Sequence, residues 1–119
     1  MEAKLYHFEL GIPASILNAL VSKTFDKLTY SRHAKLACVS DRYGKIMKPP
    51  FSVSLTDKNI IEVEAINGSA SKVLARLPYN EQYDILVAFF PESKFVKTVW
   101  LNDRNDNHYT LDASKYSKI

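Results

Sequence analysis

Hydrophobic and polar residues alternate along the second half of the chain, in the pattern of half-buried β-strands. Short polar turns separate the alternating segments, which are residues 51–55, 60–66, 72–79, 83–90 and 95–102. The Asn67-Gly68 pair is a strong hairpin signal, and the nearly continuous apolar run of 83–90 predicts a central strand buried on both faces. Consecutive strands joined by such short turns predict an antiparallel meander.

The first part of the chain changes from a twofold to a helical pattern. Residues 4–10 alternate as a short strand, and Gly11 interrupts it. Pro13 suits the first turn of a helix, and the apolar residues after it recur at intervals of three and four. These spacings predict a first helix over about residues 13–23.

A second helix is predicted to begin after Ser31, a candidate N-cap, and to end at Gly44, which tolerates a positive φ. The polar segment that follows residue 102 predicts a loop or a docked tail. The predicted fold class is therefore α+β: two N-terminal helices packed on a twisted antiparallel β-meander of four to five strands.

Length and composition favour one domain over residues 1–119. The chain is 46% hydrophobic and carries a formal net charge of +3, which permits contact with nucleic acid without requiring it. Its single cysteine suits a reducing compartment. The N-terminus lacks the pattern of a secretory signal, and no apolar run is long enough to cross a bilayer. We expect a soluble, cytoplasmic protein without membrane contact.

No metal or cofactor site is predicted. The three histidines lie far apart in the sequence, and the one thiol is that of Cys38. The segment 102–112 is rich in Asp and Asn but lacks the central glycine and the twelfth-position glutamate of a calcium loop. Three scattered glycines exclude a glycine-rich phosphate loop. Cys38 lies between two apolar residues, which predicts a buried, inert thiol.

Cationic and imidazole side chains remain as candidates for chemistry. Histidine can act as a general acid or base at neutral pH, and the planar fork of arginine matches two phosphate oxygens. A metal-independent ribonuclease needs such groups to deprotonate a 2′-hydroxyl, protonate the leaving oxygen and stabilise the developing charge. Simpler interpretations stay open: His33 as an exposed helix residue, and Arg76 as a partner of Glu62 or Glu64 across a hairpin.

Three short motifs occur in a familiar order: the helix "YSRHAKLAC…DRYG", a strand ending in "VKTVWLN", and the tail "NHYTLDASKY". The first has the style Y-S-[KR]-H-A. From about residue 28 to 116, the chain resembles small RelE-like and BrnT-like toxin domains and the related tRNase domains of colicins and contact-dependent toxins. The tail is similar to the ending of phage or prophage proteins.

The resemblance implies an endoribonuclease that works without metal or other cofactor on RNA, free or on the ribosome. Carried over residue by residue, the predicted catalytic residues are His33, Arg76, His108 and Tyr116. The residues predicted to contact RNA are Arg32, Lys35, Lys72, Lys97 and Lys115. Two features depart from the family: the net charge of +3 is low, and acidic residues fall on or near the same strands. Positive potential drives affinity for phosphates, so catalysis in this chain is an open question.

A second hypothesis is a non-catalytic phage-type protein that binds and modulates a host protein, and a third is a passive nucleic-acid-binding module. The expected partners are accordingly RNA or the ribosome, or a protein such as an antitoxin or a host factor. Unpaired edges at 51–55 and 95–102 also leave a homodimer open. The deciding geometry is whether His33, Arg76 and His108 converge on one surface.

Overall fold

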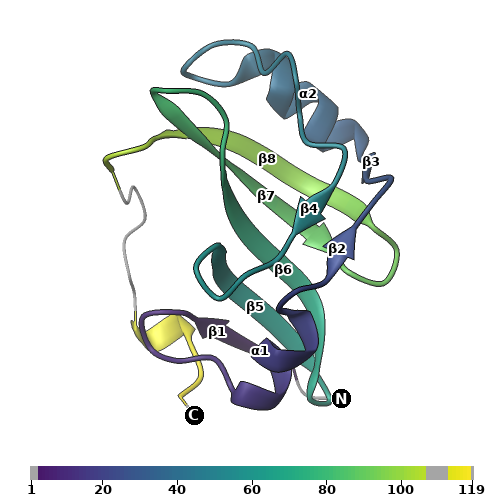
Figure 1. Ribbon diagram of the computed structural model, residues 1–119, viewed down its shortest axis with the longest axis vertical. Helices are drawn as coiled ribbons and strands as arrows, with labels where there is room; N and C mark the ends of the chain where they lie inside the picture. The colour runs from purple at the N-terminus through teal and green to yellow at the C-terminus, as the bar shows by residue number, and fades with distance from the viewer. Residues whose placement is uncertain (1–2, 107–112, 119) are drawn as a thin grey trace.

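The computed structural model describes residues 3–106 and 113–118 (Figure 1). Its strands are β1 (Ala3–His7), β2 (Thr24–Phe25), β3 (Thr29–Tyr30), β4 (Val53–Ser54), β5 (Ile60–Ile66), β6 (Ser69–Pro78), β7 (Tyr83–Phe90) and β8 (Phe95–Asp103). Its helices are α1 (Ala14–Leu20), α2 (Arg32–Ser40) and the short 3₁₀ turn η1 (Ala113–Lys115).

Six strands form one large sheet in the order β1-β5-β6-β7-β8-β3. Neighbouring strands are antiparallel except β3, which runs parallel to β8. Strands β2 and β4 form a separate two-stranded sheet, drawn in front of the large sheet in Figure 1. The rings of Phe25 on β2 and Phe89 on β7 meet at 5.3 Å, so the small sheet packs directly on the large one.

The predicted fold class is wrong. The structure is mostly β: the two helices span only seven and nine residues, and β1 precedes both and pairs with β5. The first helix ends at Leu20 because Val21 is extended and Ser22 takes a φ of 71°. The second ends at Ser40, before Gly44, where the Asp41 carboxylate accepts the Tyr43 amide N–H at 3.1 Å and turns the chain.

The predicted strands between residues 60 and 103 are confirmed as four consecutive antiparallel strands, β5 to β8. Asn67 and Gly68 both have positive φ, as a two-residue type I′ hairpin turn requires. Strand β7 is interior, and its residues 85–89 are all buried. Of the predicted strand 51–55, only Val53–Ser54 is a strand, and it lies outside the large sheet.

The core lies between one face of the large sheet and the layer made by α1, α2, β2 and β4. The side chains that the sheet buries there are Tyr6, Ile60, Val63, Ala65, Val73, Ala75, Ile85, Val87, Phe89, Val96, Val99 and Leu101. Ser31 anchors α2 to β8 of the large sheet, because its hydroxyl accepts the Ala34 amide N–H at 2.9 Å as an N-cap and donates to the Lys97 carbonyl at 3.1 Å. The prediction of Ser31 as an N-cap is confirmed.

Candidate functional site

The predicted catalytic residues are not brought together in the described part of the chain. His33 is exposed on α2, which packs on the core side of the large sheet. Arg76 lies on the opposite face, because its neighbour Ala75 points into the core and side chains alternate along a strand. His108 lies outside the described residues. The surface that would unite His33 with Arg76 is therefore absent from the described structure.

Arg76 is held inside a network at the end of the large sheet. Its Nε donates to Asp84 Oδ2 at 2.8 Å, and its Nη2 donates to the carbonyl oxygens of Asp103 at 3.0 Å and Asp106 at 2.9 Å. Arg104 contacts the second oxygen of Asp84 at 3.2 Å. Only 14% of the Arg76 side chain is exposed. This guanidinium therefore ties the end of β8 to β6 and β7.

Tyr116 brings the C-terminal segment against β1 and β5. Its hydroxyl donates to Glu62 Oε1 at 2.7 Å, and its ring meets that of His7 edge-on at 5.0 Å. The Ser117 amide donates to the Leu5 carbonyl at 2.7 Å. Tyr116 thus contacts a carboxylate and an imidazole on the face of the large sheet opposite the core, which we call the open face, and neither His33 nor Arg76 is among its described partners.

His7 is a buried imidazole that the sequence-based site did not include. It is 1% exposed, and its Nδ1 accepts the Glu9 amide N–H at 3.1 Å. Burial lowers the His7 pKa, while the carboxylates of Glu9 and Glu62 oppose that shift. The alternation of residues 4–10 puts His7 on one face of a strand with Leu5, but no local signal shows that this face is covered.

The predicted RNA-contacting residues are spread over the molecule. Arg32 and Lys35 are exposed on α2, and Lys115 is exposed in η1. Lys97 is exposed on β8 at a register shift against β7. Lys72 Nζ lies 3.8 Å from Glu64 Oε2 on the open face of the large sheet. These cations do not form one continuous cationic track in the described structure.

Cys38 is buried, as predicted. Burial raises the pKa of its thiol, and the nearby Asp41 carboxylate raises it further. A raised thiol pKa lowers the fraction of the thiolate that nucleophilic chemistry requires. The Asp41 carboxylate is itself used, since it accepts the amide N–H of Leu101 at 3.0 Å and that of Tyr43 at 3.1 Å.

The outer face of α2 combines apolar and cationic side chains. Ala34 and Cys38 point into the core, so the residues on the other side of the helix face solvent. Arg32, Leu36 and Val39 follow each other at spacings of four and three, which places them on one face. Leu36 is 59% exposed and Val39 is 60% exposed.

The linker after α2 extends this exposed face, because it runs back along the helix. The Ile46 amide donates to the Cys38 carbonyl at 2.8 Å near the helix C-terminus. At the other end, the Tyr30 hydroxyl donates to the Pro50 carbonyl at 2.6 Å. Burial raises the pKa of Tyr30, and the nearby Cys38 raises it further, so this hydroxyl stays a donor.

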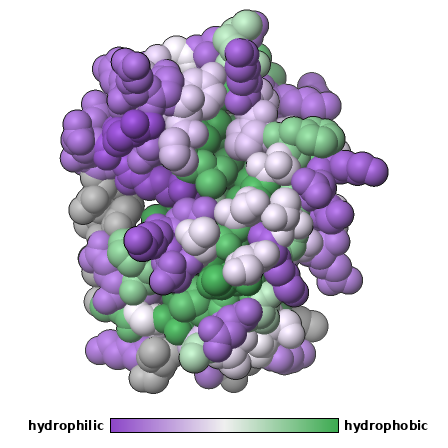
Figure 2. Space-filling model, in the orientation of Figure 1, coloured by the Kyte–Doolittle hydropathy of each residue, from purple (hydrophilic) through white to green (hydrophobic). Residues whose placement is uncertain are grey.

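Two further large apolar side chains stand on this linker, Met47 at 70% and Phe51 at 67% exposure. We define the α2 surface as the four exposed large apolar residues of helix and linker together with two exposed cations of the helix: Leu36, Val39, Met47, Phe51, Arg32 and Lys35. Figure 2 shows apolar side chains among strongly hydrophilic ones at the end of the molecule where α2 lies. Residues 27–51 contain six Lys or Arg and a single acid, Asp41, whose carboxylate binds backbone amides.

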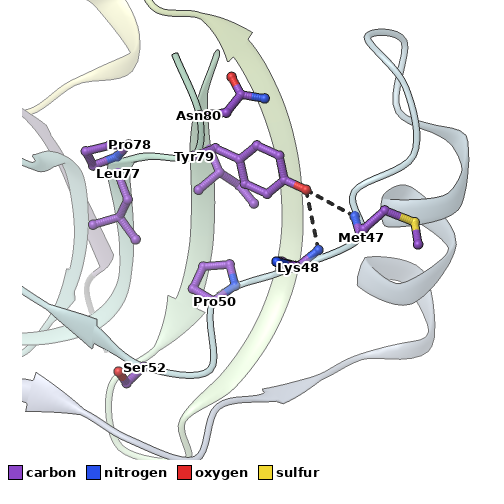
Figure 3. Close-up of a pocket in the computed structure, with 9 residues that line it drawn as sticks. Met47, Lys48, Pro50, Ser52, Leu77, Pro78, Tyr79 and Asn80 are labelled. Atoms are coloured by element: carbon purple, nitrogen blue, oxygen red, sulfur yellow. Dashed lines mark hydrogen bonds between the residues drawn. The ribbon is translucent and has the colours of Figure 1, made fainter. Parts of the chain in front are cut away.

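A cavity of about 630 Å³ lies on the other side of the linker (Figure 3). It is lined by Met47, Lys48, Pro50, Ser52, Leu77, Pro78, Tyr79, Asn80 and Ile85. The Tyr79 hydroxyl accepts the amide N–H of Met47 at 3.1 Å and that of Lys48 at 3.4 Å, bridging the linker to the β6–β7 turn. Figure 3 shows the Met47 side chain pointing away from the cavity, towards the α2 surface.

Comparison of the chain with protein-family models, with curated proteins and with solved structures finds no match. The RelE-like resemblance therefore stays a prediction. Within residues 3–106 and 113–118, no group of three His, Cys, Asp or Glu side chains is arranged to hold a metal ion. Among these same residues, no helix is long and apolar enough to span a membrane.

Proposed function

We propose that this chain is a non-catalytic binding domain that recognises an acidic segment of a partner protein, rich in apolar side chains, through the α2 surface. The observation that carries the proposal is the exposure of Leu36, Val39, Met47 and Phe51 along one helix and the linker beside it. A cluster of exposed large apolar residues is typical of protein-interaction surfaces. This conclusion develops the second sequence hypothesis, a protein that binds and modulates another protein.

The charges of the α2 surface support an acidic partner. Arg32 and Lys35 flank the apolar residues. Asp41, the single acid of residues 27–51, accepts hydrogen bonds from two backbone amides through its carboxylate. Opposite charge on the partner would steer the encounter and exclude cationic proteins. Burying Leu36 and Val39 in such a complex would contribute about 1 kcal/mol each, since each is already partly shielded in the unbound chain.

A protein partner is favoured over RNA by the kind of apolar residue that is exposed. Single-stranded RNA is held by aromatic stacking combined with a cationic groove. Three of the four exposed apolar residues on the α2 surface are aliphatic, which suits packing against another protein, and only Phe51 is aromatic. Arg76, the guanidinium predicted to bind phosphate, is already bound to Asp84 and to backbone carbonyls.

Selection from a library of random displayed peptides tests the proposal. The wild-type chain serves as bait, and the double variant Leu36→Asp/Val39→Asp serves for counter-selection. We expect the surviving peptides to combine Asp or Glu with large apolar residues, and to bind the double variant at least about tenfold more weakly. Ala19→Asp, on an exposed position of α1, is the matched control and should bind as the wild type does.

Three results would contradict this proposal. Peptides without acidic enrichment, or an equal loss of binding with Ala19→Asp, would show that the α2 surface is not the site. Micromolar binding of a polyuridine RNA that the double variant retains would favour a nucleic-acid-binding module. Discrete cleavage of total RNA that His33→Ala abolishes would instead support the endoribonuclease hypothesis.

A further inference from the structure

We propose that the cavity between the linker and the β6–β7 turn is a binding site for a small apolar carboxylate, a molecule with a flat or branched apolar body and one anionic end. This site shares only Met47 with the α2 surface, and the Met47 side chain points away from the cavity, so the site does not depend on the protein-binding proposal. Its volume of about 630 Å³ falls within the range of small-ligand pockets, which is roughly 300–1,000 Å³.

The two walls of the cavity are held in place by hydrogen bonds. The Tyr79 hydroxyl binds the linker at Met47 and Lys48, and the Tyr30 hydroxyl binds it again at Pro50. On the opposite wall, the Tyr79 amide donates to the Tyr83 carbonyl at 3.1 Å and closes the turn. A ligand that enters a cavity with fixed walls does not have to order them, so less binding energy is lost.

The interior of the cavity is mainly apolar. Pro50 contributes from the linker, Leu77 and Pro78 from the end of β6, and Ile85 from β7. Figure 3 shows the Tyr79 ring and the Pro50 ring on the two sides of this space. Flat rings and branched aliphatic groups are the bodies that such walls bury most efficiently.

Each polar side chain that lines the cavity carries a hydrogen-bond donor, and the one charged residue is a cation, which favours an anionic end of the ligand. Lys48 is the only charged residue among the described lining residues. Asn80 Oδ1 accepts the amide N–H of Gln82 at 2.9 Å and that of Tyr83 at 2.7 Å, so its NH₂ group remains for a ligand. Ser52 adds a hydroxyl. One cation with two neutral donors suits a monoanionic carboxylate better than a phosphate dianion.

Amide-detected NMR titration of the isotope-labelled chain tests this site. The probes are N-acetyl-L-tryptophan, which carries a carboxylate, and N-acetyl-L-tryptophanamide, which has the same body without the charge. We expect the acid to bind with a dissociation constant of about 1 mM, a modest affinity for a ligand of this size. It should shift the amide signals of Met47, Lys48 and Asn80, and the uncharged amide should bind about three- to fivefold more weakly.

Variants separate the two parts of the proposal. Lys48→Met should weaken the acid about three- to fivefold and leave the uncharged probe unchanged, whereas Lys45→Met, on a neighbouring exposed lysine outside the cavity, should change neither. Ser52→Trp places a large ring at the wall and should abolish binding of both probes. Leu36→Asp should leave both unaffected, so failure of this site is distinguishable from failure of the α2 surface.

Changes in amide signals confined to residues outside the cavity, or no saturable change with either probe, would overturn the proposal. Equal binding of acid and amide together with no effect of Lys48→Met would overturn its carboxylate part. Thermal melting of each variant shows whether it is folded, and the comparison of the two probes on the wild-type chain decides the charge question even if Ser52→Trp fails to fold.

Discussion

Replacing Arg76 by methionine removes a guanidinium from the end of the large sheet while keeping much of the apolar stem that packs there. Asp84, 15% exposed, then loses its 2.8 Å partner, and the carbonyls of Asp103 and Asp106 each lose one donor but keep the Asn102 side-chain amide. Breaking a buried pair from one side typically costs 3–5 kcal/mol. Arg104 still contacts Asp84, so we expect the lower end, a loss of about 3 kcal/mol in the free energy of unfolding.

Urea denaturation followed by fluorescence measures this loss, because the single tryptophan, Trp100, lies on β8 beside the network. For a chain of this length, the same loss lowers the melting temperature by about 12 °C. Lys72→Met is the matched control, since its 3.8 Å contact with Glu64 is more exposed and should contribute less than about 1 kcal/mol.

Equal, small losses in the free energy of unfolding for Arg76→Met and Lys72→Met would refute this reasoning. They would mean that the guanidinium is not needed to hold the end of β8, and that it is available for a phosphate as the sequence hypothesis supposed. A loss near 3 kcal/mol would instead mean that a loss of RNA-directed activity in an Arg76 variant is no evidence of a catalytic role, because the fold is weakened as well. The stability measurement must therefore come before any activity assay on this residue.

Two further perturbations test the described contacts. Burial lowers the His7 pKa, so on acidification the unfolded chain takes up a proton near pH 6.5, before the folded chain does. The free energy of unfolding should therefore fall as the pH drops below about 7. Urea titrations at pH 7.5 and pH 5 should show a smaller fall for His7→Gln than for the wild-type chain. Ser31→Ala removes both the α2 N-cap and the donor to the Lys97 carbonyl, and should lower the free energy of unfolding in urea by about 1–2 kcal/mol. The control Ser40→Ala, at the exposed last residue of α2, should change it by less than about 0.5 kcal/mol.

The strands from β5 to β8 were predictable because the sequence signals that define them, alternation and tight turns, are local. Side chains that alternate along 60–66 or 83–90 need only one covered face, and Asn67 and Gly68 can adopt the positive φ of a tight hairpin. The pairing of β1 with β5, and of β3 with β8, joins segments tens of residues apart. Alternation shows that a segment can be a strand but does not show which strand it pairs with.

The surroundings of the predicted site residues were not predictable for the same reason. Arg76 and His33 were chosen for their chemistry, but their surroundings are set by which face of the sheet each lies on and by which loops return to it. The partners of Arg76 include carbonyl oxygens nearly thirty residues away, at Asp103 and Asp106. Side-chain type indicates what a residue can do, whereas only the fold shows whether its bonding capacity is already used.

The arrangement of α2 is the strongest reason to expect a partner. An amphipathic helix usually buries its large apolar residues, and a sequence-based assignment would place Leu36 and Val39 in the core. Here the helix buries Ala34 and Cys38, which are small and let it lie close to β8, where the Ser31 hydroxyl binds the Lys97 carbonyl. Leu36 and Val39 stay 59% and 60% exposed in this packing, so a binding partner that covered them would gain hydrophobic free energy that folding leaves unused.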